Sequence, residues 1–271
     1  MKWIKGDVLH KGKGKSIHVV QNHPDLVWME FKDDLTAFNG KKQSSFKGKG
    51  AVNRDTSSLI FRFLKKEKIK SHWVANVDNT GMICRKLEIL PIEVVVRNRL
   101  AGSTARKFQF SEGRPLSSPL VEFYYKQDEL GDPFISSEQA LAFGFVSDGK
   151  EVEFLKIQAL QINDKLKVFF DSVGLELIDF KLEFGKEKPE MEEDGSSQWE
   201  NTNRENRFLL GDEISCDSCR LWDKKTGYRM DKDRFRLNLG GVEGSYKKVH
   251  DLLLKASFAF SAQADVIKNK V

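Results

Sequence analysis

The chain has 271 residues, of which 39% are hydrophobic and 31% are charged. Single hydrophobic cores stop growing near roughly 250–300 residues, so we expect one compact unit or two closely packed domains. The sequence contains no apolar run near the ~20 residues that a bilayer-spanning helix needs, and its start lacks the pattern of a secretory signal. These features exclude the common membrane-protein classes and predict a globular cytoplasmic protein.

The net charge is +5, from 45 basic and 40 acidic residues. This modest excess favours small anionic ligands over nucleic acid, which normally meets a concentrated basic face. The three cysteines, Cys84, Cys216 and Cys219, are too few for a disulfide framework, so we expect reduced thiols. The spacing of Cys216 and Cys219 also fits half of a zinc or redox site, although no second pair or histidine cluster accompanies them.

The N-terminal part of the chain predicts antiparallel sheet followed by a helix. Residues 16–21 and 26–31 are β-branched or apolar runs joined by a turn-forming segment, which is typical of a hairpin. Apolar side chains then recur at helical spacing over residues 53–67, with Asn53 or Asp55 as the expected N-cap.

Three further strands are predicted after this helix, over residues 72–77, 82–89 and 93–100. Pro91 separates the last two, because proline cannot donate a hydrogen bond to a sheet ladder. The break predicts a crossover between domains near residues 84–92.

The second half of the chain contains two helix signals. Ser136 and Gln139 have the spacing of a capping box, which marks the start of a helix. Apolar residues over 155–169 then follow one helical face, and this helix should end before Gly174.

Residues 175–184 alternate with a period of two, which predicts a strand with two different faces. Asp179, Lys181 and Glu183 should share one face. The core face should carry the apolar residues Ile178, Phe180, Leu182 and Phe184.

The region after this strand is polar. Residues 186–207 have no apolar period, and we expect a surface loop without chemistry there. A strand should resume over residues 207–214, and the helical spacing over residues 246–259 predicts a final helix.

The first candidate site is the turn formed by Gly12, Lys13, Gly14 and Lys15. Small residues allow a close backbone approach, and lysines supply positive charge to phosphate groups. A solvated surface turn explains the same residues, since neither the Walker A spacing nor the GxGxxG pattern is present.

A second candidate site combines Asp179, Lys181 and Glu183 with Asp212 and Glu213. Magnesium prefers oxygen ligands and usually takes only one or two protein carboxylates. Glu183 and Asp212 meet that need if their strands pair as a hairpin across the polar loop. A salt-bridged sheet face is the alternative, and spacing alone leaves both open.

Two further segments carry charge suited to anions. Arg97, Ser103 and Arg220 offer guanidinium forks and a hydroxyl for a phosphate or carboxylate, although each arginine alone fits an ordinary salt bridge. Lys126 and Asp132 lie beside a turn, for which a solvated loop is the ordinary explanation.

Taken together and in this order, the segments resemble the SAICAR synthase family, also called phosphoribosylaminoimidazole-succinocarboxamide synthases. The resemblance extends from about residue 8 to residue 250. Weaker matching stretches lie at residues 12–15, 31–40, 91–98, 102–103, 126–133 and 231–236. The specific part is the series Asp179-Phe180-Lys181-Leu182-Glu183-Phe184-Gly185, Gly211-Asp212-Glu213-Ile214-Ser215 and Arg220-Leu221-Trp222-Asp223.

The resemblance implies an α+β fold related to the kinase and ATP-grasp folds. A small N-terminal antiparallel sheet domain, residues 1–85, would lie over a larger α+β domain, residues 86–271, with ATP in the cleft between them. The implied activity is an ATP-dependent ligase of de novo purine biosynthesis. It would join L-aspartate to the carboxylate of 5-amino-1-(5-phosphoribosyl)imidazole-4-carboxylate.

The resemblance also implies roles for individual residues. The groups contacting ATP would be Gly12, Lys13 and Lys15 at its phosphates and Arg85 and Leu87 at its adenine. Glu183 and Asp212 would hold Mg²⁺. The groups gripping the phosphate and carboxylate of the ribonucleotide would be Arg97, Ser103, Arg220 and Arg236. The groups near the reacting centre would be the catalytic candidates Lys126, Asp132 and Lys181.

Two other functions fit parts of the pattern. A small-molecule kinase of related fold would use the same lysine-rich turn and acidic metal ligands. A non-enzymatic module could use the basic excess to hold a polyanion, although paired carboxylates argue against it. We expect small-molecule substrates, no nucleic acid and no membrane partner, and a chain that works alone or as a homodimer.

Overall fold

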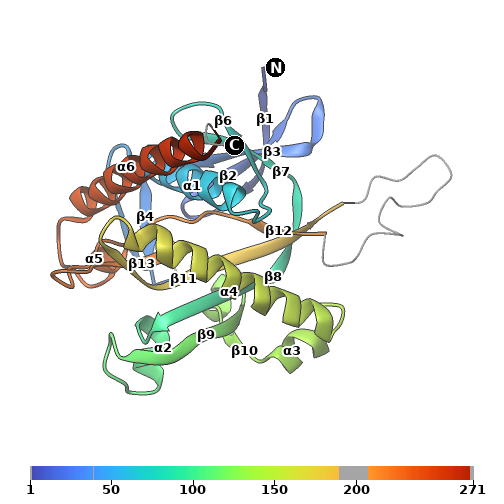
Figure 1. Cartoon of the computed structure of the whole chain (residues 1–271). Coiled ribbons are helices and arrows are strands. Elements are labelled where there is room, and N and C mark those ends of the chain that lie inside the picture. The colour runs from blue at the N-terminus through green and yellow to red at the C-terminus, as the bar shows by residue number, and fades with distance from the viewer. Residues whose placement is uncertain (1, 39, 189–206, 269–271) are drawn as a thin grey trace.

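The computed structural model describes residues 2–38, 40–188 and 207–268, which form an α+β fold (Figure 1). Within these residues, no helix combines the length and the apolar character needed to cross a membrane. The predicted polar loop at residues 186–207 lies largely outside the described residues, so its prediction stays open.

The N-terminal residues form a five-stranded antiparallel sheet in the order β1-β2-β3-β7-β6. Its strands are β1 (Lys5–Lys11), β2 (Lys15–Val20), β3 (His23–Phe31), β6 (Trp73–Asn76) and β7 (Gly81–Arg85). The pairing of β2 with β3 confirms the predicted hairpin. A separate two-stranded ribbon follows β3 and consists of β4 (Asp34–Ala37) and β5 (Lys42–Ser45).

Helix α1 (Lys49–Lys66) begins earlier than the sequence predicts. Asn53 and Asp55 lie inside the helix, so the prediction that either one caps it is wrong. The helix begins after Gly48, whose φ is +87°, and the carboxylate of Asp33 accepts the Gly48 N–H at 3.0 Å. The cap therefore comes from a distant carboxylate, which a local sequence pattern does not reveal.

The remaining strands form a six-stranded sheet in the order β10-β9-β8-β11-β12, with β13 also paired to β11. Its strands are β8 (Leu87–Arg99), β9 (Pro115–Tyr125), β10 (Phe134–Ile135), β11 (Leu175–Glu187), β12 (Phe208–Gly211) and β13 (Cys219–Asp223). Strand β12 is shorter than the predicted strand at residues 207–214.

The break predicted at Pro91 is wrong, because β8 runs straight through this residue. The register of β8 with β11 shifts between the pairs Glu93–Glu183 and Ile89–Gly185, and proline is tolerated at such an irregularity. The chain instead passes from one sheet to the other at Lys86. This crossover lies in the predicted region, and the division into domains at residues 85 and 86 stays a prediction.

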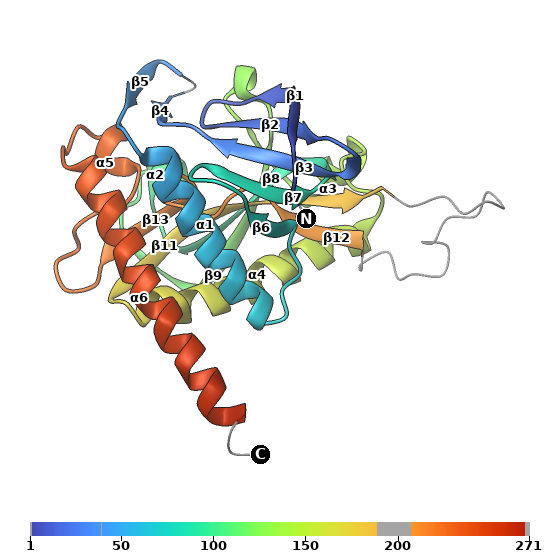
Figure 2. The ribbon, with the colours of Figure 1, turned by 90° about the horizontal axis from the view of Figure 1, so that it is seen from above.

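Each sheet is covered by a different helix, and α1 packs on β3 and β6 of the five-stranded sheet (Figures 1 and 2). Helix α4 (Gly149–Asp171) packs on β8, β9 and β11, and α6 (Val242–Lys268) lies alongside α1. The capping box predicted for Ser136 and Gln139 is present at the start of α3 (Ser137–Ala142). The short helices are α2 (Gly102–Lys107), η1 (Asp128–Leu130) and α5 (Asp233–Arg236).

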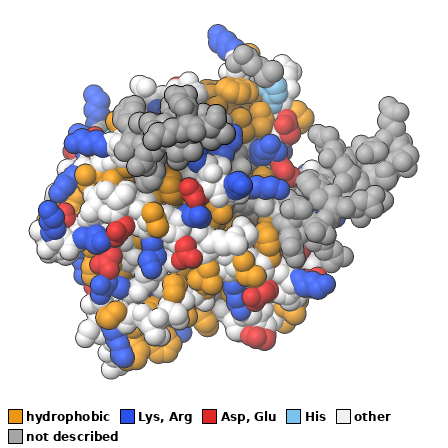
Figure 3. All heavy atoms as spheres, viewed as in Figure 1, with side chains coloured by type: hydrophobic (Ala, Val, Ile, Leu, Met, Phe, Trp, Pro, Cys, Tyr) orange, Lys and Arg blue, Asp and Glu red, His pale blue; other side chains and the backbone are white. Residues whose placement is uncertain are grey.

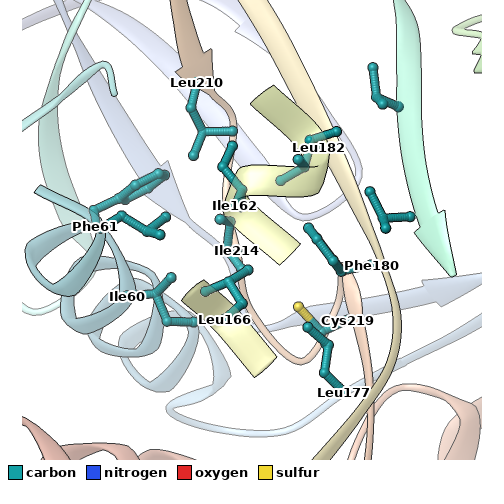
Figure 4. Packing of buried hydrophobic residues seen from close by; sticks show 14 of the residues in the cluster. Ile60, Phe61, Ile162, Leu166, Leu177, Phe180, Leu182, Leu210, Ile214 and Cys219 are labelled. Carbon is teal, nitrogen blue, oxygen red and sulfur yellow. The ribbon is translucent and has the colours of Figure 1, made fainter. Parts of the chain in front are cut away.

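Strand β11 supplies the centre of the hydrophobic core. Phe180 and Leu182 point into a cluster with side chains of α1 and α4 (Figure 4), as the alternating pattern predicts. The prediction fails at Ile178, which is buried but outside this cluster. The register with β13 shifts between Leu177 and Asp179, and Leu177 takes the place on the core face.

The surface carries charges of both signs. On the face shown in Figure 3, lysine and arginine side chains of the described residues are interspersed with aspartate and glutamate.

Candidate active site

A cavity of about 920 Å³ lies between the two sheets. Its walls come from the β1–β2 turn, β3 and β7 on one side, and from β8, β11 and the segment after β12 on the other. Most of the predicted site residues line it, namely Gly12, Lys13, Lys15, Arg85, Leu87, Lys126, Asp132, Lys181, Glu183, Asp212 and Arg236. The others, Arg97, Ser103 and Arg220, are not among its lining residues.

Four of these residues, Lys15, Lys181, Glu183 and Asp212, form what we call the cavity cluster. Strand β11 pairs antiparallel with β12, and Glu183 stands opposite Gly211, so Asp212 follows directly beside it. Lys181 Nζ lies 2.5 Å from Glu183 Oε1 and 3.3 Å from Asp212 Oδ2, while Lys15 pairs with the other oxygen of Asp212. The expected pairing of the two strands is thus confirmed.

Charge balance keeps three members of the cavity cluster ionised, namely Lys15, Lys181 and Asp212. Burial alone would raise the pKa of Asp212, but Lys15 and Lys181 hold it well below its usual range. Burial alone would lower the pKa of Lys15 and of Lys181, but neighbouring carboxylates raise both. Each lysine and the Asp212 carboxylate therefore stay charged near neutral pH.

Two carboxylates to which the sequence prediction gave no role complete these contacts. Glu93 lies 3.1 Å from Lys181 and stands opposite Glu183 in the β8–β11 register. Glu213 lies 2.7 Å from Lys15. Glu213 was part of the candidate constellation without a role, whereas Glu93 could be found only by knowing which strand lies beside β11.

The chemistry of these donors fits a magnesium ion bound together with a nucleotide. Glu183 and Asp212 present carboxylate oxygens on either side of Lys181, so one cation already occupies the space between them. Within the described residues, no group of three or more His, Cys, Asp or Glu side chains could hold a metal alone. A magnesium ion here would therefore take its remaining ligands from phosphate and water, as it usually does.

The mouth of the cavity carries further predicted residues. Lys13 Nζ, in the β1–β2 turn, lies 2.7 Å from the carboxylate of Asp128 in η1, so this pair bridges the two walls. Lys126 Nζ lies 2.5 Å from Glu183 Oε2. Burial and the neighbouring Asp128 raise the pKa of Asp132.

A second ionic group lies outside the cavity, and we call Arg97, Asp179, Arg220 and Asp233 the inner arginine network. Asp179 accepts from Arg97 at 2.5 Å and from Arg220 at 2.8 Å. Arg97 also donates to Glu122 at 2.6 Å, and Arg220 donates to Asp233 at 2.7 Å. The sequence placed Asp179 with Lys181 and Glu183, but its partners are these arginines.

Arg236 connects this network to the cavity. Its guanidinium lies 2.7 Å from Asp233 and also lines the cavity wall. Gly102 packs against Arg220, and a Cβ added there would fall 2.4 Å from Nη2 of that arginine. The adjacent Ser103 is exposed at the start of α2. Arg97, Ser103 and Arg220 are thus brought close together, beside the cavity.

Asp217 is a lining residue to which the sequence prediction gave no role. Its carboxylate accepts from Lys49 Nζ at 2.6 Å and from the Tyr246 hydroxyl at 2.7 Å. Lys49 is almost completely buried at the start of α1. Asp217 lies between two of the recognised motifs, at residues 211–215 and 220–223, whereas its two partners come from helices that only the fold places there.

The three cysteines are buried and free. Burial raises the pKa of the Cys84, Cys216 and Cys219 thiols, so they stay protonated near neutral pH. The expectation of reduced thiols agrees with this arrangement. No metal-binding group involves them among the described residues.

The family model for SAICAR synthetase matches residues 8–253 of the chain. The chain belongs to the SAICAR synthetase family. The phosphoribosylaminoimidazole-succinocarboxamide synthase of Wolinella succinogenes is 47% identical over 245 residues, which are 90% of this chain and 97% of that protein. The crystal structure of the synthase from Ehrlichia chaffeensis shares 41% identity and a TM-score of 0.82, covering 91% of this chain and 98% of that one.

A SAICAR synthetase solved in complex with ADP has a TM-score of 0.80 and 38% identity, covering 91% of this chain and 97% of that one. These comparisons confirm the family, the α+β fold and the ligase class that the ordered motifs predict. They also favour the ligase over the small-molecule kinase that the sequence left open. The roles of individual site residues stay predictions.

Proposed function

We propose that this cavity joins L-aspartate to the carboxylate of 5-amino-1-(5-phosphoribosyl)imidazole-4-carboxylate, at the cost of one ATP. The observation that carries the proposal is the cavity cluster, in which lysines and carboxylates from both sheets converge on one space. Support comes from the family match and from the relative that was solved with ADP.

The reaction needs activation because a carboxylate is a poor electrophile. In the first proposed step, a carboxylate oxygen of the ribonucleotide attacks the terminal phosphorus of ATP, and ADP leaves. The aspartate amine then attacks the activated carbonyl carbon, the C–O bond to phosphate breaks, and the amine loses a proton. The products are the amide, ADP and phosphate, and no covalent bond to the protein forms.

We assign nucleotide binding to the wall made by the five-stranded sheet. Gly12 permits a close approach of the β1–β2 turn, while Lys13 and Lys15 direct positive charge toward the phosphates. Arg85 and Leu87 line the same cavity at the crossover between the sheets, where the backbone would face adenine.

Glu183 and Asp212 would hold a magnesium ion together with the nucleotide phosphates. That ion supplies charge neutralisation for the transferring phosphoryl group when it is bound. Lys181 and Lys126 both contact Glu183, and Lys181 also contacts Asp212, so the two lysines are placed to neutralise charge on the reacting groups. Asp132 lines the cavity near them and completes the catalytic set that we propose.

We assign the ribonucleotide to the side of the cavity next to the inner arginine network. Arg236 lines the cavity there, and Arg97, Ser103 and Arg220 lie behind it. Their guanidinium groups and hydroxyl suit a phosphate monoester or a carboxylate. Binding would require the substrate to displace some of the present contacts, since Arg220 is shared between two carboxylates.

The proposed setting is the cytoplasm, with small molecules as the partners. This setting suits the three free, buried cysteines and a reaction that consumes ATP. The proposal includes a homodimer, and sedimentation would measure this oligomeric state.

A coupled assay of ADP release tests the proposed function. Purified protein with magnesium should release ADP steadily only when ATP, L-aspartate and the ribonucleotide are all present. The amide should appear in equal amount. ADP release without aspartate, with accumulation of a stable phosphorylated product, would identify a kinase instead.

A further inference from the structure

Asp212 holds an unusual backbone conformation at the centre of the site. Its φ is +55°, in the left-handed region that residues other than glycine rarely adopt. This turn directs the carboxylate to Lys15 and Lys181 instead of along the line of β12. Such a conformation persists only where neighbouring groups hold it.

His72 is the neighbour that binds the Asp212 backbone. Its Nε2 atom lies 2.9 Å from the carbonyl oxygen of Asp212. The His72 N–H donates to Leu210 O at 2.9 Å, and Ser71 forms a parallel bridge with Leu210. The segment before β6 is therefore fastened along β12, with the imidazole placed under the turn.

The surroundings fix the orientation of this imidazole. His72 is 3% exposed, and its ring packs edge-on against Phe61 of α1 with centroids 5.5 Å apart. The Asp212 carbonyl oxygen can only accept a hydrogen bond, so Nε2 must carry the hydrogen. This contact joins a residue next to the five-stranded sheet to the proposed cation ligand of the six-stranded sheet.

We propose that His72 is a positioning residue, which holds the left-handed turn at Asp212 and thereby keeps the carboxylate aimed into the cavity cluster. The inference rests on the proposed function, in which Asp212 helps to hold the magnesium nucleotide. A purely structural His72 would contribute packing against Phe61 and have no specific effect on cation binding.

Two amide variants separate these roles. The amide nitrogen of Gln can take the place of Nε2, whereas that of Asn reaches only the place of Nδ1. His72→Gln should therefore keep the donor to Asp212, and His72→Asn should lose it. Phe61→Leu serves as the control, because it disturbs the packing of the ring without removing the hydrogen bond.

The readout is Mn²⁺ binding to the full chain in the presence of ADP, followed by electron paramagnetic resonance. A net hydrogen bond of ordinary strength predicts binding roughly 2- to 10-fold weaker for His72→Asn, and within about 2-fold of the original for His72→Gln. Phe61→Leu should lower Tm while leaving the Mn²⁺ affinity unchanged.

The outcomes separate the inference from the function on which it rests. If the original protein binds Mn²⁺ with ADP and His72→Asn binds it equally well, the positioning role is wrong. If the original protein binds no Mn²⁺ with ADP, the proposed function fails and the inference fails with it. Should His72→Asn not fold, His72→Met replaces it, since Met has the length of Gln without a donor. Equal binding by the Met and Gln variants would then overturn the inference.

Discussion

The cavity cluster and the inner arginine network use the same kind of contact on the same strand. Lys181 and Asp179 lie two residues apart on β11, and each is bound by opposite charges. The cavity cluster opens on a space of about 920 Å³, whereas Arg97 is only 3% exposed and has protein acceptors around its guanidinium. Identical ion-pair chemistry thus serves two different purposes.

The type of cation explains part of the difference. Lysine presents a compact charge on a flexible stem, so it can exchange a carboxylate for a phosphate at little geometric cost. Arginine presents a planar fork that a pair of carboxylates can fix, as Asp179 and Asp233 do for Arg220. We infer that the cavity cluster exchanges its contacts readily when ligands bind, whereas the network gives up only those contacts at Arg220 that the ribonucleotide replaces.

The largest expected effect comes from removing one anionic oxygen from the cavity cluster. Asp212→Asn and Glu183→Gln keep the side-chain shape but lose the charge that would hold the ion. Even outer-shell changes at metal sites cost about 10- to 100-fold, so each variant should lose about 100-fold or more in magnesium-dependent turnover.

The ADP-release assay at several magnesium concentrations measures this loss, and circular dichroism checks folding. Glu213→Gln is the matched control, because it contacts the same Lys15 without being assigned to the ion. Near-normal rates for both test variants at ordinary magnesium would show that the carboxylates are structural partners.

A smaller effect is expected in the inner arginine network. Arg220→Lys keeps the positive charge and loses the fork, and a hydrogen bond to a charged group is worth roughly 1.5–3 kcal/mol. The Michaelis constant for the ribonucleotide should rise by about 10- to 150-fold, while that for ATP barely moves. Steady-state kinetics with each substrate varied in turn decide this.

Arg99→Lys provides the comparison, because Arg99 forms a more exposed pair with Glu176 and is assigned no ligand. It should show near-original kinetics. An equal loss for ATP and the ribonucleotide in Arg220→Lys would refute the assignment to the ribonucleotide.

The network should also leave a signature in the pH dependence of stability. Burial would raise the pKa of Asp233, but Arg220 and Arg236 hold it at about 2. A depressed pKa gives stability that is present above about pH 4, the unfolded value, and is lost as the pH falls toward 2. Between pH 6 and 3 the free energy of unfolding of the original chain should fall by about 1 kcal/mol more than that of Asp233→Asn. Urea unfolding of both proteins across this range measures the difference, and parallel curves would contradict it.

The smallest effect concerns the cysteines near the two ionic groups. Cys216 and Cys219 are buried, and their thiol pKa values are raised, so a thiol reagent should modify them only after unfolding. Spectrophotometric titration in native buffer and in denaturant checks this. Rapid reaction of these thiols in native buffer would contradict the prediction. Zinc that co-purifies with the protein and is released by the thiol reagent would support the metal-site alternative.

The two ionic groups also show how far sequence patterns reach. The period of β11 placed Lys181 and Glu183 on one face. A hairpin across the polar loop before Asp212 was expected to bring Asp212 beside Glu183, and the two strands do pair in this way. Asp179 shares that face, because its register with β8 continues without a shift through Lys181 and Glu183, but it lies further along the strand, opposite Arg97. Local alternation predicts the face of a residue and cannot predict which side chain the neighbouring strand places opposite it.

Other parts of the site depend on long-range packing. His72 and Lys49 lie in segments with no ligand motif, and they acquire partners at Asp212 and Asp217 only when the sheets and helices assemble. Pro91 illustrates the converse, because a residue that usually breaks a strand is accommodated where the sheet register shifts. The ordered motifs thus identified the family, while the supporting contacts required the fold.

Oxygen transfer tests the central claim most directly, namely that the cavity activates the ribonucleotide carboxylate by phosphoryl transfer. The ribonucleotide labelled with ¹⁸O in its carboxylate is converted with ATP and L-aspartate, and mass spectrometry follows the label in the released phosphate. The proposed reaction predicts one labelled oxygen in phosphate for each amide formed, because the C–O bond of the carboxylate is the one that breaks. Amide formation with unlabelled phosphate would contradict the account.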